Sequence, residues 1–272
     1  YKPSSILVVD NHSTDGTYNY LKNNQILHIR SKTNTGSAGG WNFCLNYAIA
    51  HKFDFVWLMD DDGYPDKNSL FNLVKNFKDD ISCLSSIVID ENSYLNLAIP
   101  LPILNKHNNP TVFSLKRKIN KLDDINLQNS AIYNFATLFN GALLSVKKIK
   151  ETGQINKSFF LYGEEVDYFF RLREKGKVLT LTSSLHYHPN IKKEWKLIKI
   201  YYYLKNSIYL NYKYMDKPLI RSIGNIIIIY YRIIRFNKIE SIIDLHRFKN
   251  FKIIIIAIIR GFQGCIGNDF QK

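Results

Sequence analysis

The sequence predicts an α/β fold, in which the strands of an open sheet alternate with helices that flank it. Short apolar runs rich in β-branched and aromatic residues are typical of buried strands, and three such runs are Ile6–Val9, Phe55–Met59 and Cys83–Ile89. Apolar residues recur at helical spacing in Asn42–His51 and Lys67–Phe77. This alternation indicates one large α/β domain, and a helical extension follows it.

The composition is that of a chain with a sizeable core. Of its 272 residues, 46% are hydrophobic and 14% are aromatic, which argues against disorder. The cysteines Cys44, Cys83 and Cys265 are too far apart for a zinc pattern or a disulfide framework, so a reducing compartment is the simplest interpretation. No signal peptide is visible, and the chain enters its first predicted strand almost at once. We therefore expect an internal piece of a longer chain.

Positive charge is concentrated in the last quarter of the chain. The net charge is +14, and between Asn190 and Arg260 there are 15 Lys and Arg against 4 Asp and Glu, or +11. Such a surface attracts nucleic acid, anionic lipid or an anionic glycan. The apolar runs Ile226–Ile234 and Ile253–Ile259 are too short to span a bilayer. They favour either helices on a membrane surface or helices that pack on the first domain or on a partner chain.

Three carboxylates, Asp60–Asp62, directly follow the predicted strand Phe55–Met59, and Gly63 and Pro65 then form a turn. Open α/β sheets bind ligands at the carboxyl ends of their strands. Like charges this close repel each other unless a cation or a hydrogen-bond network holds them. Oxygen ligands suit Mg²⁺ or Mn²⁺, often shared with a substrate phosphate. The alternative is a solvated acidic turn.

A glycine-rich segment, Asn34–Gly40, precedes Trp41 and the predicted helix Asn42–His51. Glycine lets backbone approach a ligand closely, and a glycine turn that opens a helix can cradle an anion or a nucleotide. The segment matches neither the dinucleotide GxGxxG pattern nor a Walker A loop, so a plain loop is the alternative.

The second half of the predicted domain is less regular. From Asp90 to Gln128 the pattern dissolves, which predicts a long insertion near the substrate. Ile132–Val146 is strand-like again, and Lys147–Thr152 has the pattern of a short helix. Val178–Leu185 is the last predicted strand.

Titratable side chains accompany the last helix and strand of this domain. Glu164 and Glu165 precede the amphipathic helix Val166–Lys175, where acids favour a helix N-terminus through its dipole. His186 and His188 follow the last strand. One of them could complete a metal site with the aspartates, and a histidine pair that binds no metal is the alternative.

Four motifs occur in one order along the chain: VVDN at Val8–Asn11, NTGSAGG at Asn34–Gly40, WLMDDD at Trp57–Asp62 and GEEVDY at Gly163–Tyr168. In this order they closely resemble glycosyltransferase family 2, and within it the galactofuranosyl- and rhamnosyltransferase-like branch. The resemblance covers about Ile6–Pro189. It implies a GT-A fold, a Rossmann-like mixed sheet flanked by helices that binds a nucleotide diphospho-sugar.

The same resemblance implies a domain division and some departures. It implies a catalytic domain at residues 1–189, followed by a basic helical extension at residues 190–272. The family's first strand, which carries TYNR or similar before VVDN, is absent from the sequence. The loop reads GSAGG where the family has GGAGG, and Glu165 stands where the family usually has Asp.

The resemblance also implies the donor and metal residues. The positions that match its nucleotide-sugar-binding residues are Asp10, Asn34, Gly36, Gly39, Gly40, Trp41, Asp60 and Asp61. Asp60 and Asp62 match metal ligands, and His188 fits the family's metal histidine better than His186 because of its spacing from the strand. The implied cofactor is Mn²⁺ or Mg²⁺.

Glu165 matches the family's general base, with Glu164 and Asp167 as substitutes. A divalent cation offsets the charge that grows on a leaving diphosphate, while a carboxylate removes the proton of the attacking hydroxyl. One base and one displacement invert the anomeric carbon. We therefore expect inverting transfer of galactofuranose or rhamnose from a UDP- or dTDP-sugar to a cell-surface glycan or a lipid-linked acceptor.

A lipid-linked acceptor would place the protein in the cytoplasm, bound peripherally to the inner face of the cell membrane, with the basic extension on anionic lipid. Two other functions stay open: a nucleotidyltransferase, and a truncated, non-catalytic glycan-binding or scaffold protein with the same fold. Nucleic acid is not an expected partner because no recognised motif for it is present. The sequence does not specify an oligomeric state.

Overall fold

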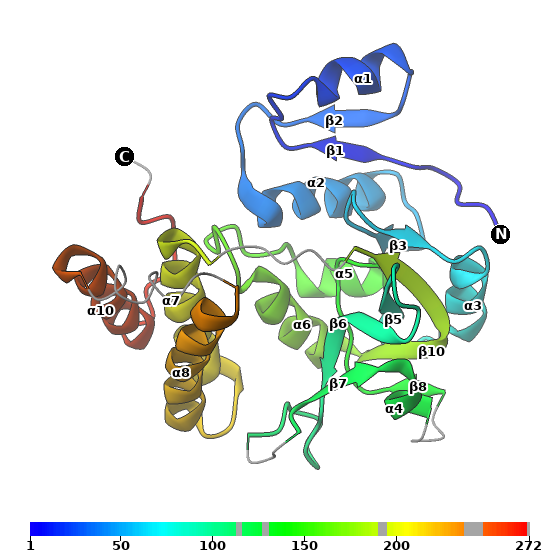
Figure 1. The fold of residues 1–272 in the computed structure, drawn as a ribbon. Helices are drawn as coiled ribbons and strands as arrows, with labels where there is room; N and C mark the ends of the chain where they lie inside the picture. Colours follow the sequence, from blue (N-terminus) through cyan, green and yellow to red (C-terminus); the bar gives the residue numbers. More distant parts are fainter. Residues whose placement is uncertain (113–115, 127–130, 190–194, 237–246, 271–272) are drawn as a thin grey trace. The chain divides into compact units, whose positions relative to one another are not determined.

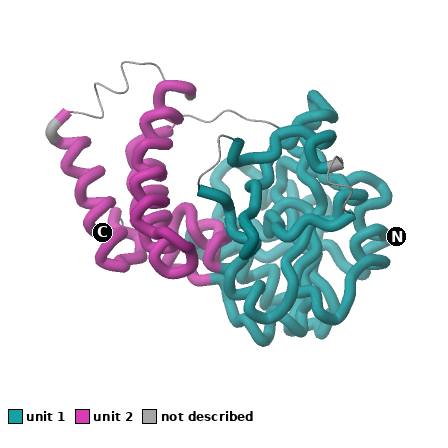
Figure 2. Tube along the Cα trace, turned by 90° about the horizontal axis from the view of Figure 1, so that it is seen from below, with its two compact units in different colours: residues 1–35, 39–155, 168–190 teal, residues 36–38, 156–167, 191–272 magenta. Residues whose placement is uncertain are grey.

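The structure is a computed structural model, and it describes residues 1–112, 116–126, 131–189, 195–236 and 247–270. The chain forms two compact units (Figure 2). The first unit consists of residues 1–35, 39–155 and 168–190, and the second of residues 36–38, 156–167 and 191–272. The second unit therefore contains the segment 156–167 as well as the C-terminal part of the chain.

A small parallel sheet opens the first unit. Strands β1 (Val8–Asp10) and β2 (His28–Arg30) pair in parallel, and helix α1 (Thr17–Asn23) connects them (Figure 1). Parallel neighbours need such a crossover connection. The predicted strand at Ile6–Val9 is confirmed, although it begins and ends slightly later.

The main sheet of the first unit is mixed. Its path runs β3-β9-β5-β10-β4, with β6, β7 and β8 attached beside it. The bounds are β3 Phe55–Leu58, β4 Tyr64–Pro65, β5 Ile81–Asp90, β6 Asn96–Pro102, β7 Lys118–Lys121, β8 Ile132–Tyr133, β9 Ala142–Ser145 and β10 Lys177–His188. Strands β5 and β10 run parallel, whereas β9 is antiparallel to both β3 and β5. All ten residues of β5 are buried, as expected of a central strand.

The predicted strands Phe55–Met59, Cys83–Ile89 and Val178–Leu185 are confirmed as β3, β5 and β10. The helix predicted at Lys67–Phe77 is confirmed as α3 (Ser69–Asn76), and it packs Leu70 and Leu73 on the sheet.

Two sequence expectations were wrong in part. The stretch Asp90–Gln128 was expected to have no regular pattern, but its described residues form β6, β7 and helix α4 (Leu122–Asn126). The run Ile132–Val146 was expected to be one strand, but it splits into β8 and β9. Strands β6 and β7 were not predicted because the stretch contains prolines and only short apolar runs. The two strands are formed by pairing between segments that are distant in the sequence.

Three further helices belong wholly or in part to the first unit. They are α2 (Gly36–Ala50), α5 (Val146–Thr152) and α6 (Glu164–Lys175). Helix α2 begins six residues before the helix predicted at Asn42, so Gly39 and Gly40 lie within it rather than in a preceding turn. Helix α6 likewise begins with the two glutamates and has Glu164, Glu165 and Asp167 in its first turn.

The C-terminal part of the second unit is helical, as predicted. Helices α7 (Leu197–Tyr214), α8 (Pro218–Phe236) and α10 (Phe248–Phe262) share one apolar core. Its buried members are Ile200, Tyr201, Tyr202, Leu204, Ile229, Ile233, Ile254 and Ala257. Within the described residues, none of the helices has both the length and the apolar character that a bilayer crossing requires.

Candidate donor and metal site

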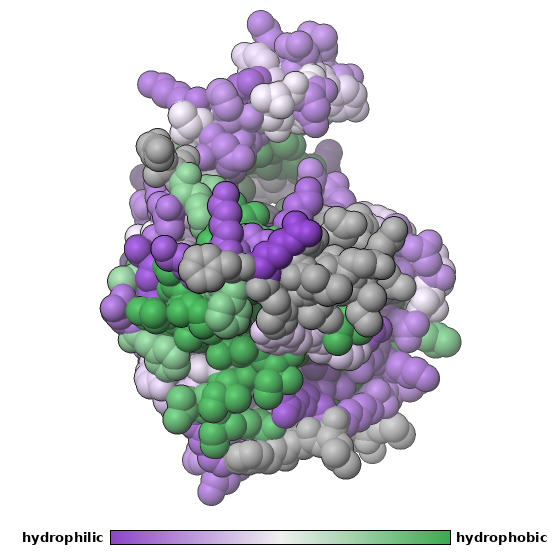
Figure 3. All heavy atoms as spheres, turned by 60° about the vertical axis from the view of Figure 1, so that its left-hand side comes forward, coloured by the Kyte–Doolittle hydropathy of each residue, from purple (hydrophilic) through white to green (hydrophobic). Residues whose placement is uncertain are grey.

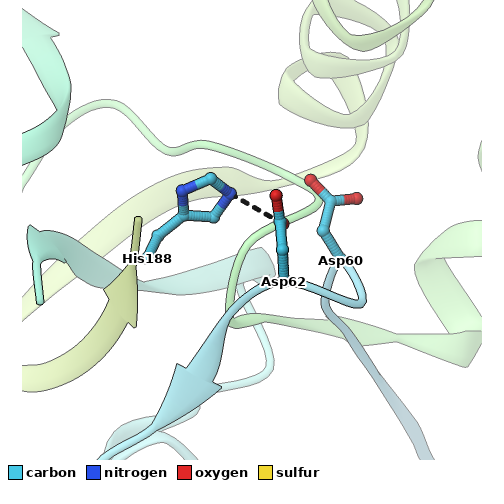
Figure 4. Close-up of side chains that lie close together, drawn as sticks. All are labelled: Asp60, Asp62 and His188. Carbon is cyan, nitrogen blue, oxygen red and sulfur yellow. Dashed lines mark ion pairs between the residues drawn. The ribbon is translucent and has the colours of Figure 1, made fainter. Parts of the chain in front are cut away.

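Two carboxylates and one imidazole converge at the ends of β3 and β10 (Figure 4). Asp60, Asp62 and His188 each offer a ligand atom, and these atoms all lie within 4.8 Å of one another. Among the residues that the structure describes, they are the one cluster of three or more acidic, histidine or cysteine side chains that could hold a metal ion.

Strand pairing brings these distant residues together. The acidic turn follows β3 and leads into β4, which pairs antiparallel with β10, so that Pro65 faces His186 and Tyr64 faces Tyr187. The register places the end of β10, with His188, beside the turn that carries Asp62. The sheet therefore sets the geometry of the cluster.

The hydrogen bonds of His188 define the role of its ring nitrogens. Nδ1 lies 2.8 Å from the carbonyl oxygen of Pro189, and because a carbonyl only accepts, Nδ1 carries a hydrogen and donates it. In the neutral ring, Nε2 then points a lone pair at Oδ1 of Asp62, 3.0 Å away. Two lone pairs at this distance repel unless a proton or a cation lies between them. Two carboxylates and an imidazole are a suitable donor set for Mn²⁺, while carboxylates also suit Mg²⁺.

The carboxyl group of Asp60 is in a partly buried position. Burial raises its pKa, and the charges of Asp62 and Asp61 raise it further, whereas a hydrogen bond from Asn140 and the proximity of His188 lower it. The net effect is a pKa above the ordinary value. A cation held by the cluster would compensate this buried charge.

His186 has a different environment from His188. Its side chain is fully buried, and burial lowers its pKa to about 4. A Cβ at Gly63 would overlap Nε2 of His186, and a Cβ at Gly141 would lie 3.0 Å from its Cβ. The ring therefore fills the space that these two glycines leave beside the acidic turn.

Asp10 is buried at the end of β1. Its Oδ1 accepts the backbone N–H of Ser13 at 2.8 Å, and its Oδ2 lies 3.4 Å from Nη1 of Arg30. Burial by itself would raise the pKa of this carboxyl, but the Ser13 hydrogen bonds and the Arg30 charge outweigh burial and hold it below the ordinary value. Asp10 is thus ionised and fixes the turn that follows β1.

The glycine-rich segment is tied to the same turn through Asn11. The Oδ1 of Asn11 accepts both the backbone N–H and the hydroxyl of Thr35, and its Nδ2 donates to Oδ1 of Asn34. A Cβ at Gly39 would overlap the Thr35 side chain, whereas Gly40 has open space around its Cα. Of these two glycines, Gly39 is therefore needed for packing and Gly40 leaves room for a ligand.

Gly36, Trp41 and Asp61 are three further residues that the sequence predicts at the site. Gly36 has a φ of +68°, and a Cβ there would lie 2.9 Å from the carbonyl oxygen of Phe160. Trp41 stacks on Phe139, with ring centroids 4.5 Å apart. Asp61 is exposed to solvent.

The three acids of the GEEVDY motif differ in their contacts. Glu164 is buried, accepts a hydrogen bond from the Ser37 hydroxyl, and has a pKa that burial raises. The Oδ1 of buried Asp167 accepts from Nζ of Lys213 at 2.9 Å and from the hydroxyl of Tyr214 at 2.8 Å. Glu165 is half-buried in the first turn of α6.

Sequence reasoning did not find several partners of these residues. Ser37, Asn140, Lys213 and Tyr214 contact predicted site residues that lie far from them in the chain. Ser37 stands inside the glycine-rich motif, which is a usable signal, whereas Asn140 lies outside the four motifs. Lys213 and Tyr214 lie in the basic extension, and nothing in their local sequence marks them.

Comparison with known proteins gives the family. A model described as glycosyl transferase family 2 matches residues 1–138. The chain belongs to glycosyltransferase family 2. Galactofuranosyltransferase GlfT1 of Mycolicibacterium smegmatis is 26% identical over 202 residues, which cover 72% of this chain and 65% of that protein. GlfT1 of Mycobacterium tuberculosis is 27% identical over 208 residues, covering 72% of this chain and 64% of that protein. The match thus spans slightly less than two thirds of the length of these relatives.

Solved structures show that this family 2 chain has the GT-A fold, as the four motifs implied. A structure of GalNAc-T7 with UDP, GalNAc and Mn²⁺ has a TM-score of 0.55 at 15% identity, covering 79% of this chain and 43% of that chain. Residues 1–349 of Staphylococcus aureus TarS in complex with UDP have a TM-score of 0.56 at 12% identity, covering 96% of this chain and 71% of that chain. At these identities the likeness concerns the fold.

Proposed function

We propose that this family 2 chain is an inverting, metal-dependent glycosyltransferase that moves a sugar from a nucleoside-diphosphate donor to a hydroxyl of a glycan. The observation that carries the proposal is the cluster of Asp60, Asp62 and His188 in a chain of this family. A solvated acidic turn has no need of an imidazole whose Nε2 faces one of the carboxylates.

The relatives support a particular donor. The curated relatives are galactofuranosyltransferases, and the TarS and GalNAc-T7 structures contain UDP. These likenesses favour UDP over dTDP, and galactofuranose over rhamnose, as the nucleotide and the sugar of the donor. The Mn²⁺ of the GalNAc-T7 structure likewise favours Mn²⁺ over Mg²⁺.

We assign the metal-binding and donor-binding roles to residues of this chain as follows. Asp60, Asp62 and His188 would hold the divalent cation, which supplies charge compensation for the departing diphosphate. The proposed nucleoside-binding residues are Asp10, Asn34, Gly36, Gly39 and Gly40, with Asp61 beside the metal ligands and Trp41 next to the glycines. The open space at Gly40 supports its role, because a backbone without a side chain lets a ligand come close.

Glu165 is the proposed general base. Asp167 already accepts hydrogen bonds from Lys213 and Tyr214, and Glu164 is buried against Ser37. Of the three acids, Glu165 is the least buried, so it is best suited to meet an acceptor from solution. It would take the proton of the acceptor hydroxyl as the oxygen attacks the anomeric carbon from the side opposite to the diphosphate, which inverts that carbon.

The proposed acceptor is a cell-surface glycan under construction or its lipid-linked precursor. With a lipid-linked acceptor, such an enzyme would work in the cytoplasm at the inner face of the cell membrane. The excess of Lys and Arg in the last quarter of the chain supports this location.

Isothermal titration of UDP and dTDP, each with and without Mn²⁺, tests the proposal. We expect Mn²⁺-dependent binding of UDP that Asp62→Asn abolishes and that Asp79→Asn, an exposed aspartate in the same unit, leaves unchanged. Hydrolysis of the UDP-sugar should follow the same pattern. Absence of both binding and hydrolysis would instead favour a non-catalytic glycan-binding or scaffold protein with this fold.

A further inference from the structure

Helix α8 has apolar residues on two opposite faces. Its residues Ile229 and Ile233 are buried in the core that α8 shares with α7. A second set, three or four residues apart, is exposed by between 43% and 64%, and its members are Leu219, Ile220, Ile223, Ile227, Tyr231 and Ile234. Residues at this spacing lie on one side of a helix, so they form a continuous exposed stripe.

Helix α10 repeats this arrangement. Ile254 and Ala257 are buried in the shared core. The residues on its exposed stripe are between 39% and 48% exposed, and they are Phe251, Ile255, Ile259 and Phe262. Figure 3 faces the second unit and shows hydrophobic side chains gathered into a broad area with hydrophilic side chains next to it. Contiguous exposed apolar side chains are typical of interaction sites.

The charges of the two helices are all of one sign. Their cationic residues are Arg221, Arg232, Arg235, Lys249, Lys252 and Arg260, and neither helix contains Asp or Glu. Arg221 pairs with Asp216 and Arg260 with Asp269, while Lys249 and Lys252 are exposed on α10. A partner of this surface must therefore offer both apolar groups, to cover the isoleucines, and negative charge.

We propose that the exposed stripes of α8 and α10 form a docking surface for an anionic lipid bilayer. An interfacial helix buries its apolar side at the boundary of headgroups and acyl chains while its Lys and Arg contact anionic headgroups. A second copy of this surface fits less well, because it would bring like charges together. The described helices are not long and apolar enough to cross a bilayer, so the surface lies on it.

This inference is independent of the sugar-transfer activity, and vesicle flotation tests it directly. Ile223→Asn combined with Ile227→Asn changes only exposed positions, so folding should be retained, as circular dichroism would verify. The matched control is Ile6→Asn, an isoleucine 68% exposed in the first unit. The probes are phosphatidylcholine vesicles with and without phosphatidylglycerol.

We expect the full chain to bind vesicles that contain phosphatidylglycerol and to dissociate at high salt. The double isoleucine variant should bind about tenfold more weakly or worse, whereas Ile6→Asn should bind as the wild type does. Lys249→Gln with Lys252→Gln should reduce the dependence on phosphatidylglycerol, and Lys75→Gln with Lys78→Gln in the first unit should not.

Two results would overturn the inference. One is equal behaviour of the wild type and the double isoleucine variant with anionic vesicles, including no binding by either. The other is a dimer in light scattering that the double variant converts to a monomer while vesicle binding is absent, which would assign the stripes to contact between copies.

Discussion

Nε2 of His188 lies 3.0 Å from Oδ1 of Asp62, although the two residues are far apart in the sequence. His188 ends strand β10, and Asp62 lies in the turn between β3 and β4. The Nδ1 of the same ring donates to the carbonyl of Pro189, which leaves Nε2 to face the carboxylate. Asp60 lies close to both, so the three side chains could hold a metal ion, which is the role proposed for them above.

The first prediction concerns this ligand set. His188→Gln removes the imidazole but keeps a polar side chain, and we expect the affinity for Mn²⁺ in the presence of UDP to fall about tenfold or more. Titration calorimetry measures this directly. His107→Gln is the control because His107 is exposed in the first unit and lies outside the cluster. Unchanged Mn²⁺ affinity in His188→Gln would remove His188 from the metal site.

The second prediction concerns Gly63, which follows the acidic turn. A Cβ there would overlap Nε2 of His186, and that ring is fully buried. We expect Gly63→Ala to destabilise the protein by about 1–3 kcal/mol and to weaken Mn²⁺ binding, because the turn must shift.

The control for Gly63→Ala is Gly224→Ala in helix α8, where nothing lies within 4 Å of the added Cβ. That variant should be more stable than the wild type by about 0.5–1 kcal/mol, since glycine is a poor residue inside a helix. Urea unfolding measures both. A Gly63→Ala protein as stable as the wild type would show that His186 can be displaced at little cost.

The sequence could predict the strands near the site, but not which of the two histidines at the end of β10 is buried. Phe55–Leu58 is an apolar run of ordinary strand length, so a local pattern was enough to find β3. His186 and His188 are two residues apart on one strand and so share a face, and alternation alone does not separate them. What separates them is Gly63 and Gly141, whose missing side chains let His186 be buried, and this depends on the folded sheet.

The glycine-rich segment shows a second limit. Three glycines within five residues predict a loop, but α2 begins at Gly36 and continues through Gly39 and Gly40. The close fit of the Thr35 side chain against Gly39 and the bond of Thr35 to Asn11 hold the start of this helix. Such tertiary contacts override local propensity.

The third prediction concerns the ion pairs of the second unit. The Nζ of Lys205 is bonded to Asp269 and to the carbonyl oxygen of Gly267, and the Lys205 side chain has no exposed surface. Asp269→Ala leaves this cation buried without its carboxylate, so we expect a loss of about 3–5 kcal/mol.

Asp216→Ala is the matched variant, because Asp216 also pairs with an arginine but is 43% exposed in its side chain. That change should cost about 0–1 kcal/mol. Chemical unfolding followed by tyrosine and tryptophan fluorescence measures the difference. Equal losses in the two variants would mean that burial of Lys205 adds nothing to the pair.

The fourth prediction concerns pH. Burial by itself would raise the pKa of Asp269, but hydrogen bonds from Lys205 and Tyr201 and the charges of Lys205 and Arg260 lower it below its ordinary value of 3.8. A group whose pKa is lower in the folded state stabilises that state above its unfolded pKa and loses this contribution as the pH falls. The stability difference between the wild type and Asp269→Ala should therefore be constant above about pH 5 and shrink below about pH 4. A difference that grows on acidification would contradict this.

The last prediction separates the base from its neighbours in the GEEVDY motif. Glu165→Gln should lower kcat by about 10²–10⁴-fold without changing UDP binding, because a base acts on the acceptor and not on the nucleotide. Asp167→Asn should instead lower the free energy of unfolding by about 1–3 kcal/mol, since the Asp167 carboxylate accepts from both Lys213 and Tyr214. Glu164→Gln serves as a control for the local helix, because its partner is Ser37 rather than solvent. If kcat were lost in Glu164→Gln and retained in Glu165→Gln, the base would be the buried glutamate, and its raised pKa would then suit proton transfer near neutral pH.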